Sequence, residues 1–408
     1  MFQPFFLFKK FSKKTFLFLS FLFSISIAIA QPIQLSELTE ISVVVADPGT
    51  HELFEAFGHP AIRIKDPANR IDIAYNYGIF DFDQPYFYLN FTRGYLNYKV
   101  EAWPYPAFEN SYIRENRSLK EYVLNMSMGQ KQSVFEFLEN NIKPENQHYF
   151  YDYFYDNCAT RIWDAFKAAL GDDLHFDESY IEPKHSFRTL VDSLTVHKPW
   201  GDFGIDLCLG LPMDKKLNSY EYMYLPEFLG RSIDHATITI NGNEQPFVKS
   251  SRMIFQSLPR EIKVGLFTPN FLFWSIFAFV FILTIIELVL KRKFVFLDVL
   301  IFGTAGLVGL LLFILWVATD HQAAVNNLNI IWANPLYLVG IYFLIKKSKP
   351  GWLPVYFLCI GILLLLFLIA WPINPQGINV AIIPIALTIF TRSVFLYLRL
   401  KKSSVTDQ

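Results

Sequence analysis

Hydrophobic positions divide this chain into a first part with short, mixed runs and a last part with long, continuous ones. Between residues 31 and 265, apolar residues alternate with polar ones or recur at helical spacing, as in an ordinary folded domain. From residue 266 to residue 400, the runs approach the ~20 residues that a helix needs to cross a bilayer. The pattern therefore predicts an α+β domain followed by an all-α membrane domain.

Five apolar runs make up the last part: 271–290, 295–318, 330–345, 352–371 and 378–398. The third is short, and we expect it to begin earlier, near Asn326. Lysine and arginine clusters follow the first, third and fifth runs, whereas the loops 319–329 and 372–377 contain neither residue. This alternation follows the positive-inside pattern. It predicts five spans, with the C-terminus in the cytoplasm and residues 31–265 outside it.

The first thirty residues have the features of a secretory signal peptide. Four lysines within residues 9–14 precede an apolar run, 15–30, which ends in Ala28-Ile29-Ala30. A positive region, an apolar core and small residues at a cleavage point are typical of such signals. An uncleaved anchor is the alternative, and both interpretations predict that the following domain is exported.

Two alternating segments near the start of the exported domain predict an antiparallel hairpin. Residues 61–65 and 70–78 alternate around a turn at 66–69. If Lys65 faces Arg70, then His59 lies opposite Asn76 with both side chains on one face. An asparagine carbonyl there would fix the orientation of the imidazole. A slip of one residue would separate the pair.

The segment 151–171, YDYFYDNCATRIWDAFKAALG, predicts a helix that begins at a cysteine. Asp156 and Asn157 are capping types, apolar residues follow at helical spacing, and Gly171 is a suitable stop. Cys158 should therefore lie in the first turn, where the helix N-terminus favours a thiolate. Two interpretations stay open: a small buried hydrophobic residue, or a nucleophile that needs a base elsewhere.

Other elements follow from the same patterns. Residues 119–126 are typical of a strand, and helical spacing appears at 130–142, 186–194 and 225–234. The aromatic segment 91–98 reads as a strand followed by a turn.

Composition excludes several function classes. The net charge is −1 and nothing resembles a nucleic-acid-binding motif, so we expect no nucleic-acid partner. His51 and His59 alone do not make a metal site, because no further closely spaced cysteine or histidine ligands accompany them. We expect neither a metal nor a cofactor. A disulfide between Cys208 and Cys158 is an alternative that would remove the nucleophile.

Charged residues near the hairpin allow two interpretations each. His51 and Glu52 could support His59 or replace it as the base, or they could lie on a surface loop. Arg93 and Arg117 could bind a phosphate head group or form salt bridges.

Charged residues of the membrane part are equally open. Asp320 and His321 lie in an external loop, where they could meet a substrate or cap helices. Glu287 and Arg392 fall inside apolar runs, which is a flag for function. Both lie near cytoplasmic ends, so we expect their side chains to snorkel to the membrane surface.

His59, Asn76 and Cys158 form a base, an orienting residue and a nucleophile in a thiol version of the catalytic triad. The motifs FGHPAIRI, YNYGIFDF and YDNCATRIWDA resemble the permuted NlpC-type papain-like enzymes, including the lecithin:retinol-acyltransferase-like proteins. Combined with the five apolar runs and the loop 319–329, they resemble the Lnb family of bacterial lipoprotein N-acyltransferases.

The resemblance implies a permuted papain-like, NlpC-type fold for the exported domain. It divides the chain into a signal peptide (1–30), a thiol acyltransferase domain (31–183), a juxtamembrane region (184–265), a five-helix transmembrane domain (266–400) and a cytoplasmic tail (401–408). The protein would lie in the bacterial cytoplasmic membrane, with its catalytic domain on the periplasmic side.

The resemblance also implies a two-step acyl transfer. Cys158 would take an acyl chain from a phospholipid and pass it to the α-amine of a diacylglyceryl-modified lipoprotein. His59 would move the protons and Asn76 would orient it. The backbone N–H of Cys158 would stabilise the oxyanion, with Tyr155 and Asn157 nearby.

Two other functions remain open from the sequence. A membrane-tethered NlpC-type cysteine peptidase or amidase would act on cell-wall peptides, but it would need only a tether rather than five spans. A non-enzymatic membrane receptor would have a structural Cys158.

Overall fold

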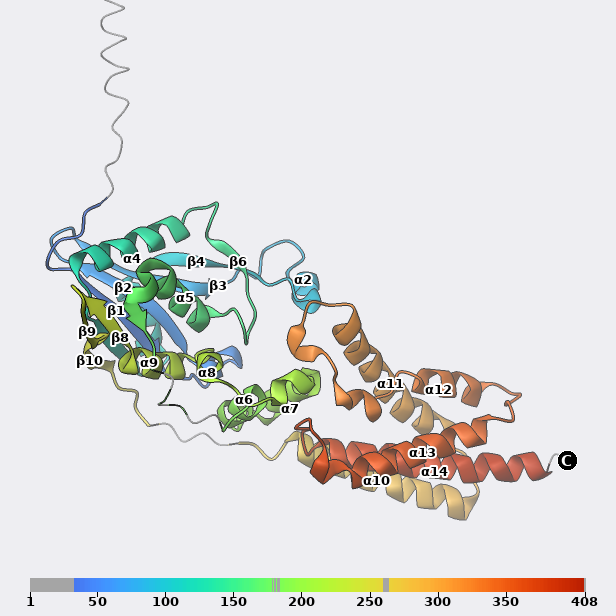
Figure 1. Cartoon of the computed structure of the whole chain (residues 1–408). Helices are drawn as coiled ribbons and strands as arrows, with labels where there is room; N and C mark the ends of the chain where they lie inside the picture. Colours follow the sequence, from blue (N-terminus) through green and yellow to red (C-terminus); the bar gives the residue numbers. More distant parts are fainter. Residues whose placement is uncertain (1–32, 178, 180, 182–183, 260–263, 407–408) are drawn as a thin grey trace, which may run out of the picture.

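The computed structural model describes residues 33–406, with gaps at 178, 180, 182–183 and 260–263. A mixed α+β domain is followed by a bundle of apolar helices (Figure 1), as the hydrophobic pattern predicts. The expected signal peptide, residues 1–30, lies outside the described residues.

A seven-stranded antiparallel sheet in the order β10-β5-β1-β2-β3-β4-β6 forms the centre of the first domain. Its strands are β1 (Glu40–Ala46), β2 (His59–Asp66), β3 (Ile71–Ile79), β4 (Asn97–Pro104), β5 (Leu119–Leu124), β6 (His148–Phe150) and β10 (Val248–Phe255). A second sheet contains β7 (Leu174–His175), β8 (Thr237–Ile240) and β9 (Asn243–Pro246). Because β10 comes from the region before the membrane, that region completes the main sheet.

Helices cover both faces of the main sheet. Alternate residues of β1 face opposite sides: Val43 packs in one core and Val44 in the other. The first core contains α4 (Met128–Asn141), α5 (Cys158–Leu170) and α9 (Pro226–His235), and the second contains α3 (Tyr105–Arg114). The helices expected at 130–142 and 225–234 and the strand expected at 119–126 are thus confirmed.

The expectation of a strand at 91–98 is wrong at its beginning. Residues Phe87–Arg93 form the short helix α2, and β4 starts only at Asn97. Tyr86 and Gly94 flank the helix in the left-handed conformation, with φ of 60° and 85°. The Gly94 N–H caps the helix by donating to a carbonyl of its last turn. This local capping outweighs the strand preference of the aromatic side chains.

The connecting helices complete the domain. They are η1 (Phe54–Phe57), η2 (Gly171–Asp173), α6 (Phe187–Thr195), α7 (Pro199–Cys208), η3 (Leu211–Asp214) and α8 (Ser219–Tyr222). The predicted helix at 186–194 corresponds to α6.

All five apolar runs contain helix in the second part. Its elements are α10 (Pro269–Leu290), α11 (Val295–Val317), η4 (Gln322–Ala324), η5 (Leu328–Ile331), α12 (Tyr337–Ile345), α13 (Leu353–Ile369), η6 (Trp371–Ile373) and α14 (Ile382–Thr406). Within the described part of the chain, α10, α11 and α14 are the only helices whose length and composition suffice to span a bilayer. The third run is not one helix from Asn326, because η5 and a turn before Pro335 precede α12. Five spans stay a prediction.

The expectation that Glu287 and Arg392 snorkel is wrong. Both are buried inside the bundle, where Nη1 of Arg392 donates to Oε2 of Glu287 at 2.5 Å. Arg392 Nε also donates to Asp298 Oδ1 of α11 at 2.7 Å. A charge that faces neighbouring helices can pair with them and has no need to reach the membrane surface. The cluster joins α10, α11 and α14.

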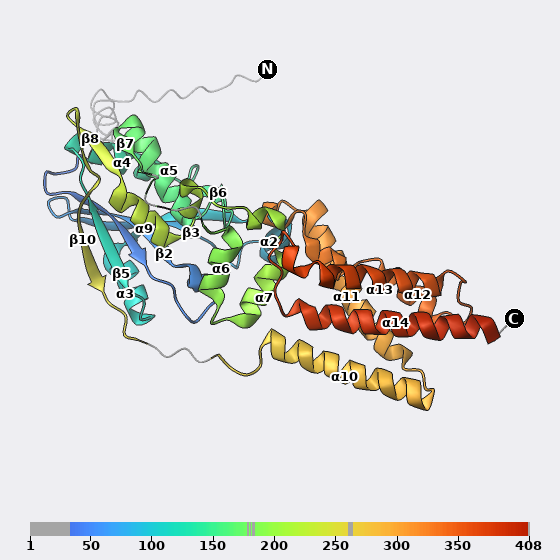
Figure 2. The same ribbon diagram turned by 60° about the horizontal axis from the view of Figure 1, so that its bottom comes forward.

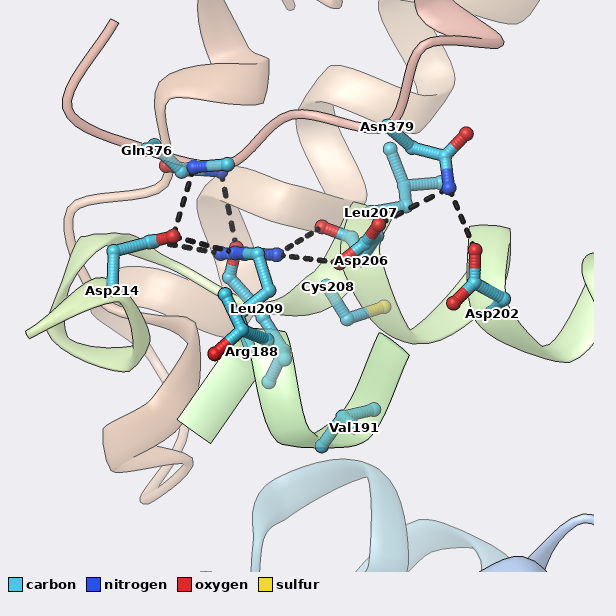
Figure 3. A network of polar contacts seen from close by, with 12 residues as sticks. Arg188, Val191, Asp202, Asp206, Leu207, Cys208, Leu209, Asp214, Gln376 and Asn379 are labelled. Carbon is cyan, nitrogen blue, oxygen red and sulfur yellow. Dashed lines mark hydrogen bonds and ion pairs between the residues drawn. The ribbon is translucent and has the colours of Figure 1, made fainter. Parts of the chain in front are cut away.

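A second buried arginine joins the exported domain to the loops of the bundle (Figure 3). Arg188 of α6 is 1% exposed. Its guanidinium donates to Asp206 Oδ1 at 2.8 Å and to Asp214 Oδ1 at 2.9 Å. It also donates to the carbonyls of Leu209 and Gly210. Arg188 thus holds α6, α7 and η3 together.

Loops of the bundle bind the same arginine cluster. Asn379 donates to both Asp202 and Asp206, and the backbone N–H of Gly377 donates to Asp214. Gln376 donates to the Leu209 carbonyl at 3.2 Å. A polar junction therefore connects α7 and η3 with the loop between α13 and α14.

The loop between α11 and α12 binds this region too. Asn327 donates to the Leu207 carbonyl at 2.8 Å, and the Gly210 N–H donates to the Ala323 carbonyl at 2.7 Å. A Cβ on Gly210 would come within 1.9 Å of the Val325 carbonyl oxygen, so the two segments are in tight backbone contact.

We predict that Arg188→Met destabilises the protein by roughly 3–5 kcal/mol, because it leaves Asp206 and Asp214 buried without their cation. Thermal unfolding of the detergent-solubilised full chain measures the loss. Arg231→Met is the matched control, since Arg231 pairs with Glu227 on the surface, where such a pair contributes at most ~1 kcal/mol. Equal melting temperatures of the two variants would contradict this role of Arg188.

Candidate active site

Asn157 fixes the turn that presents Cys158. Its Oδ1 accepts from the backbone N–H groups of Ala159 at 2.8 Å and Thr160 at 3.1 Å, which forms the predicted N-cap of α5. Its Nδ2 donates to the carbonyls of Tyr153 and Tyr224. Both ends of the amide are engaged within the protein, so Asn157 positions the helix start and offers no free donor to a substrate.

The hairpin of β2 and β3 brings His59 and Asn76 together in a register different from the predicted one. Lys65 faces Asp72 instead of Arg70, because the four-residue turn spans residues 67–70 instead of 66–69. A shift of two residues keeps every side chain on its face. His59 and Asn76 are therefore diagonal neighbours on the two strands, and the distance from His59 Nε2 to Asn76 Oδ1 is 2.5 Å. Since a carbonyl oxygen only accepts, Nε2 carries the proton and Nδ1 is left as the basic nitrogen.

Gly78 allows α5 to approach this hairpin. Continuing the observed register places Gly78 across from His59. A Cβ on Gly78 would lie 3.3 Å from the Cβ of Cys158 and 3.3 Å from the Tyr151 ring. Its φ of 86° is also one that other residues rarely adopt. Cys158 thus packs directly on the end of the hairpin that carries His59.

The resting site holds a neutral thiol and a neutral imidazole. Burial lowers the pKa of His59 to about 4, although the hydrogen bond that His59 donates to Asn76 opposes this, and the charge of Arg117 lowers it further. Burial raises the pKa of Cys158 to about 12, although Tyr151 and backbone N–H groups at the helix start oppose this rise. The expectation that the helix N-terminus favours a resting thiolate is therefore wrong, because the loss of solvation outweighs it.

Two tyrosines missing from the sequence-based site line Cys158. The Tyr151 hydroxyl hydrogen-bonds the Cys158 sulfur, and burial raises the pKa of Tyr151, so this hydroxyl stays protonated. The Tyr149 hydroxyl is buried without a hydrogen-bond partner among the described residues. A Cβ on Gly78 would lie 3.9 Å from it. The sequence signal was the aromatic run before Cys158, which is equally typical of a core.

Arg117 lies behind the histidine instead of at a lipid-binding surface. It is 6% exposed and donates to the Asp47 carbonyl at 2.8 Å. Its guanidinium lies over the ring of Tyr112, which stacks on His59 with ring centroids 6.3 Å apart. Of the two interpretations, the structure supports a structural role, with Glu115 as the paired carboxylate.

The remaining candidates near the hairpin lie outside this group. Tyr155 packs against Phe187 of α6 in a separate apolar core. The tyrosine beside the Cys158 sulfur is Tyr151, not the predicted Tyr155. His51 and Glu52 are exposed, and the His51 backbone binds Glu55 and Lys198.

The candidates near the membrane meet each other at α2. Arg93 is exposed and lies over the ring of Tyr95. The Asp320 N–H donates to the Arg93 carbonyl at 2.9 Å, and His321 Nε2 donates to the Phe91 carbonyl at 3.0 Å. Asp320 and His321 thus connect the two parts of the protein.

The three cysteines are free thiols in the structure, so the disulfide between Cys158 and Cys208 is not formed. Asp192, Asp202 and Asp206 bring carboxylate oxygens within 4.8 Å of one another beside Arg188. Burial, together with the neighbouring Asp206 and Asp202, raises the pKa of Asp192 to about 8. A protonated Asp192 limits repulsion in this cluster, which we assign to the junction.

Two family models match the chain. Residues 31–193 match the Lnb N-terminal periplasmic domain, and residues 261–404 match the Lnb transmembrane domain. No curated protein and no solved structure matches it. The matches describe an inner-membrane protein with a periplasmic domain and are consistent with a lipoprotein-modifying membrane enzyme. Because both models describe parts of one family and together cover most of the chain, the protein belongs to the Lnb family.

Proposed function

We propose that the protein is a lipoprotein N-acyltransferase that works through an acyl-Cys158 thioester. The acyl donor is a phospholipid and the acceptor is the α-amine of an N-terminal diacylglyceryl-cysteine. The observation that supports this most is the packing of the buried Cys158 on a hairpin where Asn76 orients His59. A nucleophile, a base and an orienting group are the parts that covalent acyl transfer needs.

In the first step, His59 Nδ1 takes the thiol proton while the Cys158 sulfur attacks the ester carbonyl. Concerted proton transfer suits the pair, because neither charged form is favoured in the buried resting site. The backbone N–H of Cys158 and the hydroxyls of Tyr149 and Tyr151 are the candidate oxyanion donors. Collapse releases a lysophospholipid, whose alcohol receives the proton from His59.

In the second step, the lipoprotein amine attacks the thioester. His59, again neutral, takes a proton from the amine as the new amide bond forms, and Cys158 leaves as a thiol. Microscopic reversibility gives His59 the roles of base and acid in turn. The covalent intermediate implies ping-pong kinetics.

The membrane part favours lipid substrates over the cell-wall peptides of a tethered peptidase. A tether needs one helix, whereas this chain has a bundle fixed to the catalytic domain by two loops. We further propose that the C-terminus is cytoplasmic, since the positively charged ends of the apolar runs then face the cytoplasm. The exported domain would have a permuted papain-like fold.

A receptor with a structural cysteine is the competing function. It would explain the burial of Cys158 but gives no reason for a hydrogen-bonded His59–Asn76 pair beside it. The basic Nδ1 that this pair leaves on His59, next to the hairpin end on which Cys158 packs, favours the enzyme.

We predict that Cys158 becomes acylated when the reconstituted protein is given phospholipid with labelled acyl chains. Intact-mass and peptide mass spectrometry detect the thioester, which hydroxylamine removes. Cys158→Ala abolishes labelling. Cys208→Ala, the control at a half-buried thiol outside the site, keeps it. Labelling that persists in Cys158→Ala would contradict the assigned nucleophile.

We predict that His59→Ala and Asn76→Ala slow thioester formation, the first by roughly 10²–10⁴-fold, as for loss of a general base. Asn76→Ala has the smaller effect, because it removes the acceptor that orients the ring and sets its tautomer but leaves the base itself in place. Single-turnover labelling rates measure both. An unchanged rate in His59→Ala would exclude it as the base.

Mass spectrometry of lipoprotein N-termini tests the acceptor. Cells that rely on this protein alone should carry amide-linked acyl groups on the N-terminal cysteine, and cells with Cys158→Ala should carry free α-amines. Identical N-termini in both strains would refute lipoprotein acylation, even if Cys158 forms a thioester.

We predict an acid limb near pH 4 in the rate of thioester formation, because His59 must be neutral to accept the proton. Arg117→Met moves this limb to higher pH, since the arginine's charge contributes to the lowered pKa of His59. Arg117→Lys keeps the positive charge and is the matched control. Initial labelling rates, measured from ~1 unit below to ~4 units above this pKa, follow the limb. The same limb in Arg117→Met and in Arg117→Lys would contradict the effect of the charge.

A further inference from the structure

The helix α2 and its flanking loop expose a group of apolar side chains. Tyr86 is 77% exposed, Tyr88 is 75% exposed and Leu89 is 55% exposed. Phe82 and Phe91 are exposed beside them. Residues 84–92 contain no charged side chain. We call the five exposed residues Phe82, Tyr86, Tyr88, Leu89 and Phe91 the α2 face.

The α2 face lies beside the end of the bundle that the proposed topology places outside the cytoplasm. Figures 1 and 2 both place α2 beside the external end of α11. The loop after α11 binds the last turn of α2 through Asp320 and His321. A Cβ on Gly94 would come within 3.0 Å of the Asp320 backbone, so the contact is tight. The external end of a spanning helix lies at the interface between lipid and water.

The side chains of the α2 face suit this depth. Tyrosine concentrates at membrane interfaces, where its ring meets the acyl region and its hydroxyl meets water. Moving leucine and phenylalanine side chains from water to the lipid boundary lowers the free energy. On a monomer in water, exposed apolar groups of this kind are a liability.

An aromatic series leads from the α2 face into the active site. Phe87 of α2 packs on Phe80 with ring centroids 6.3 Å apart, and Phe80 packs on Tyr98 at 5.1 Å. Tyr98 packs on Tyr151 at 4.6 Å, and Tyr151 hydrogen-bonds Cys158. Apolar groups therefore continue from the exposed helix to the thiol.

We propose that the α2 face is a membrane-binding surface, which enters the periplasmic leaflet and holds the side of the domain from which the aromatic series starts against the lipid. Its occupant is the bilayer itself. The contact with lipid does not depend on the proposed acyl transfer. Delivery of an acyl donor along the aromatic series does rest on it.

Site-directed spin labelling measures the depth of the α2 face. The full chain, with Cys158→Ala, Cys208→Ala and Cys359→Ala, receives Leu89→Cys and is reconstituted in vesicles of phosphatidylethanolamine and phosphatidylglycerol. Power-saturation EPR compares collisions with oxygen, which concentrates in lipid, and with a water-soluble nickel chelate. Glu136→Cys on α4 is the control, because α4 lies away from the bundle in both views and Glu136 is exposed.

We expect the oxygen-to-nickel collision ratio at Leu89→Cys to exceed that at Glu136→Cys several-fold. Tyr88→Cys repeats the measurement on a neighbouring position, so that a folding defect of one variant does not decide the outcome. Equal ratios at all three positions would overturn the proposal and would leave the α2 face to a partner in water.

A second measurement separates lipid contact from lipid delivery. Leu89→Asp in the otherwise unchanged protein should slow acylation of Cys158 from bilayer phospholipid by at least several-fold. A wild-type rate in Leu89→Asp would overturn delivery through this face. If the unchanged protein forms no thioester while the labels report lipid contact, the proposed function fails and the membrane-binding surface stands.

Discussion

The buried contacts of Arg188 hold the periplasmic domain at a fixed position relative to the bundle. One guanidinium bonds two carboxylates and three backbone carbonyls of α7, η3 and the turn between them, and the loop after α13 bonds the same carboxylates. An ion of this kind is expensive to desolvate, so it is stable only in a complete network. Separation of the domain from the bundle would break that network. The proposed acyl transfer needs such a fixed distance, since its lipid substrates would be confined to the membrane and Cys158 could not diffuse to them.

The active site depends on a second buried arrangement that has the opposite electrostatics. The Arg188 cluster keeps its charges paired, whereas the Cys158–His59 pair rests without charge because burial disfavours thiolate and imidazolium alike. Asn76 then does more than orient the ring. By accepting from Nε2 it sets the tautomer, and this leaves the basic electron pair on Nδ1.

The sequence predicted those features that follow from local chemistry or from period. Asn157 was recognisable as an N-cap, and the alternation of β2 and β3 placed His59 and Asn76 on one face even though the register was shifted by two residues. Features that depend on tertiary contacts were not predictable. Arg392 looked like a snorkelling residue because its partners Glu287 and Asp298 are more than ninety positions away. Tyr151 was one aromatic among many until the fold placed it beside Cys158.

Burial of the site has a chemical consequence that links its two halves. A thioester is open to hydrolysis, and an acyltransferase must keep water from competing with the acceptor amine. The aromatic side chains around Cys158 surround the sulfur with apolar groups, while Gly78 lets α5 pack against the sheet without a gap. The same desolvation raises the pKa of the thiol, so the exclusion of water makes the nucleophile harder to ionise. The same burial lowers the pKa of His59, so both shifts oppose an ion pair in the resting site. In the proposed mechanism the proton therefore moves to His59 only as the carbon–sulfur bond forms.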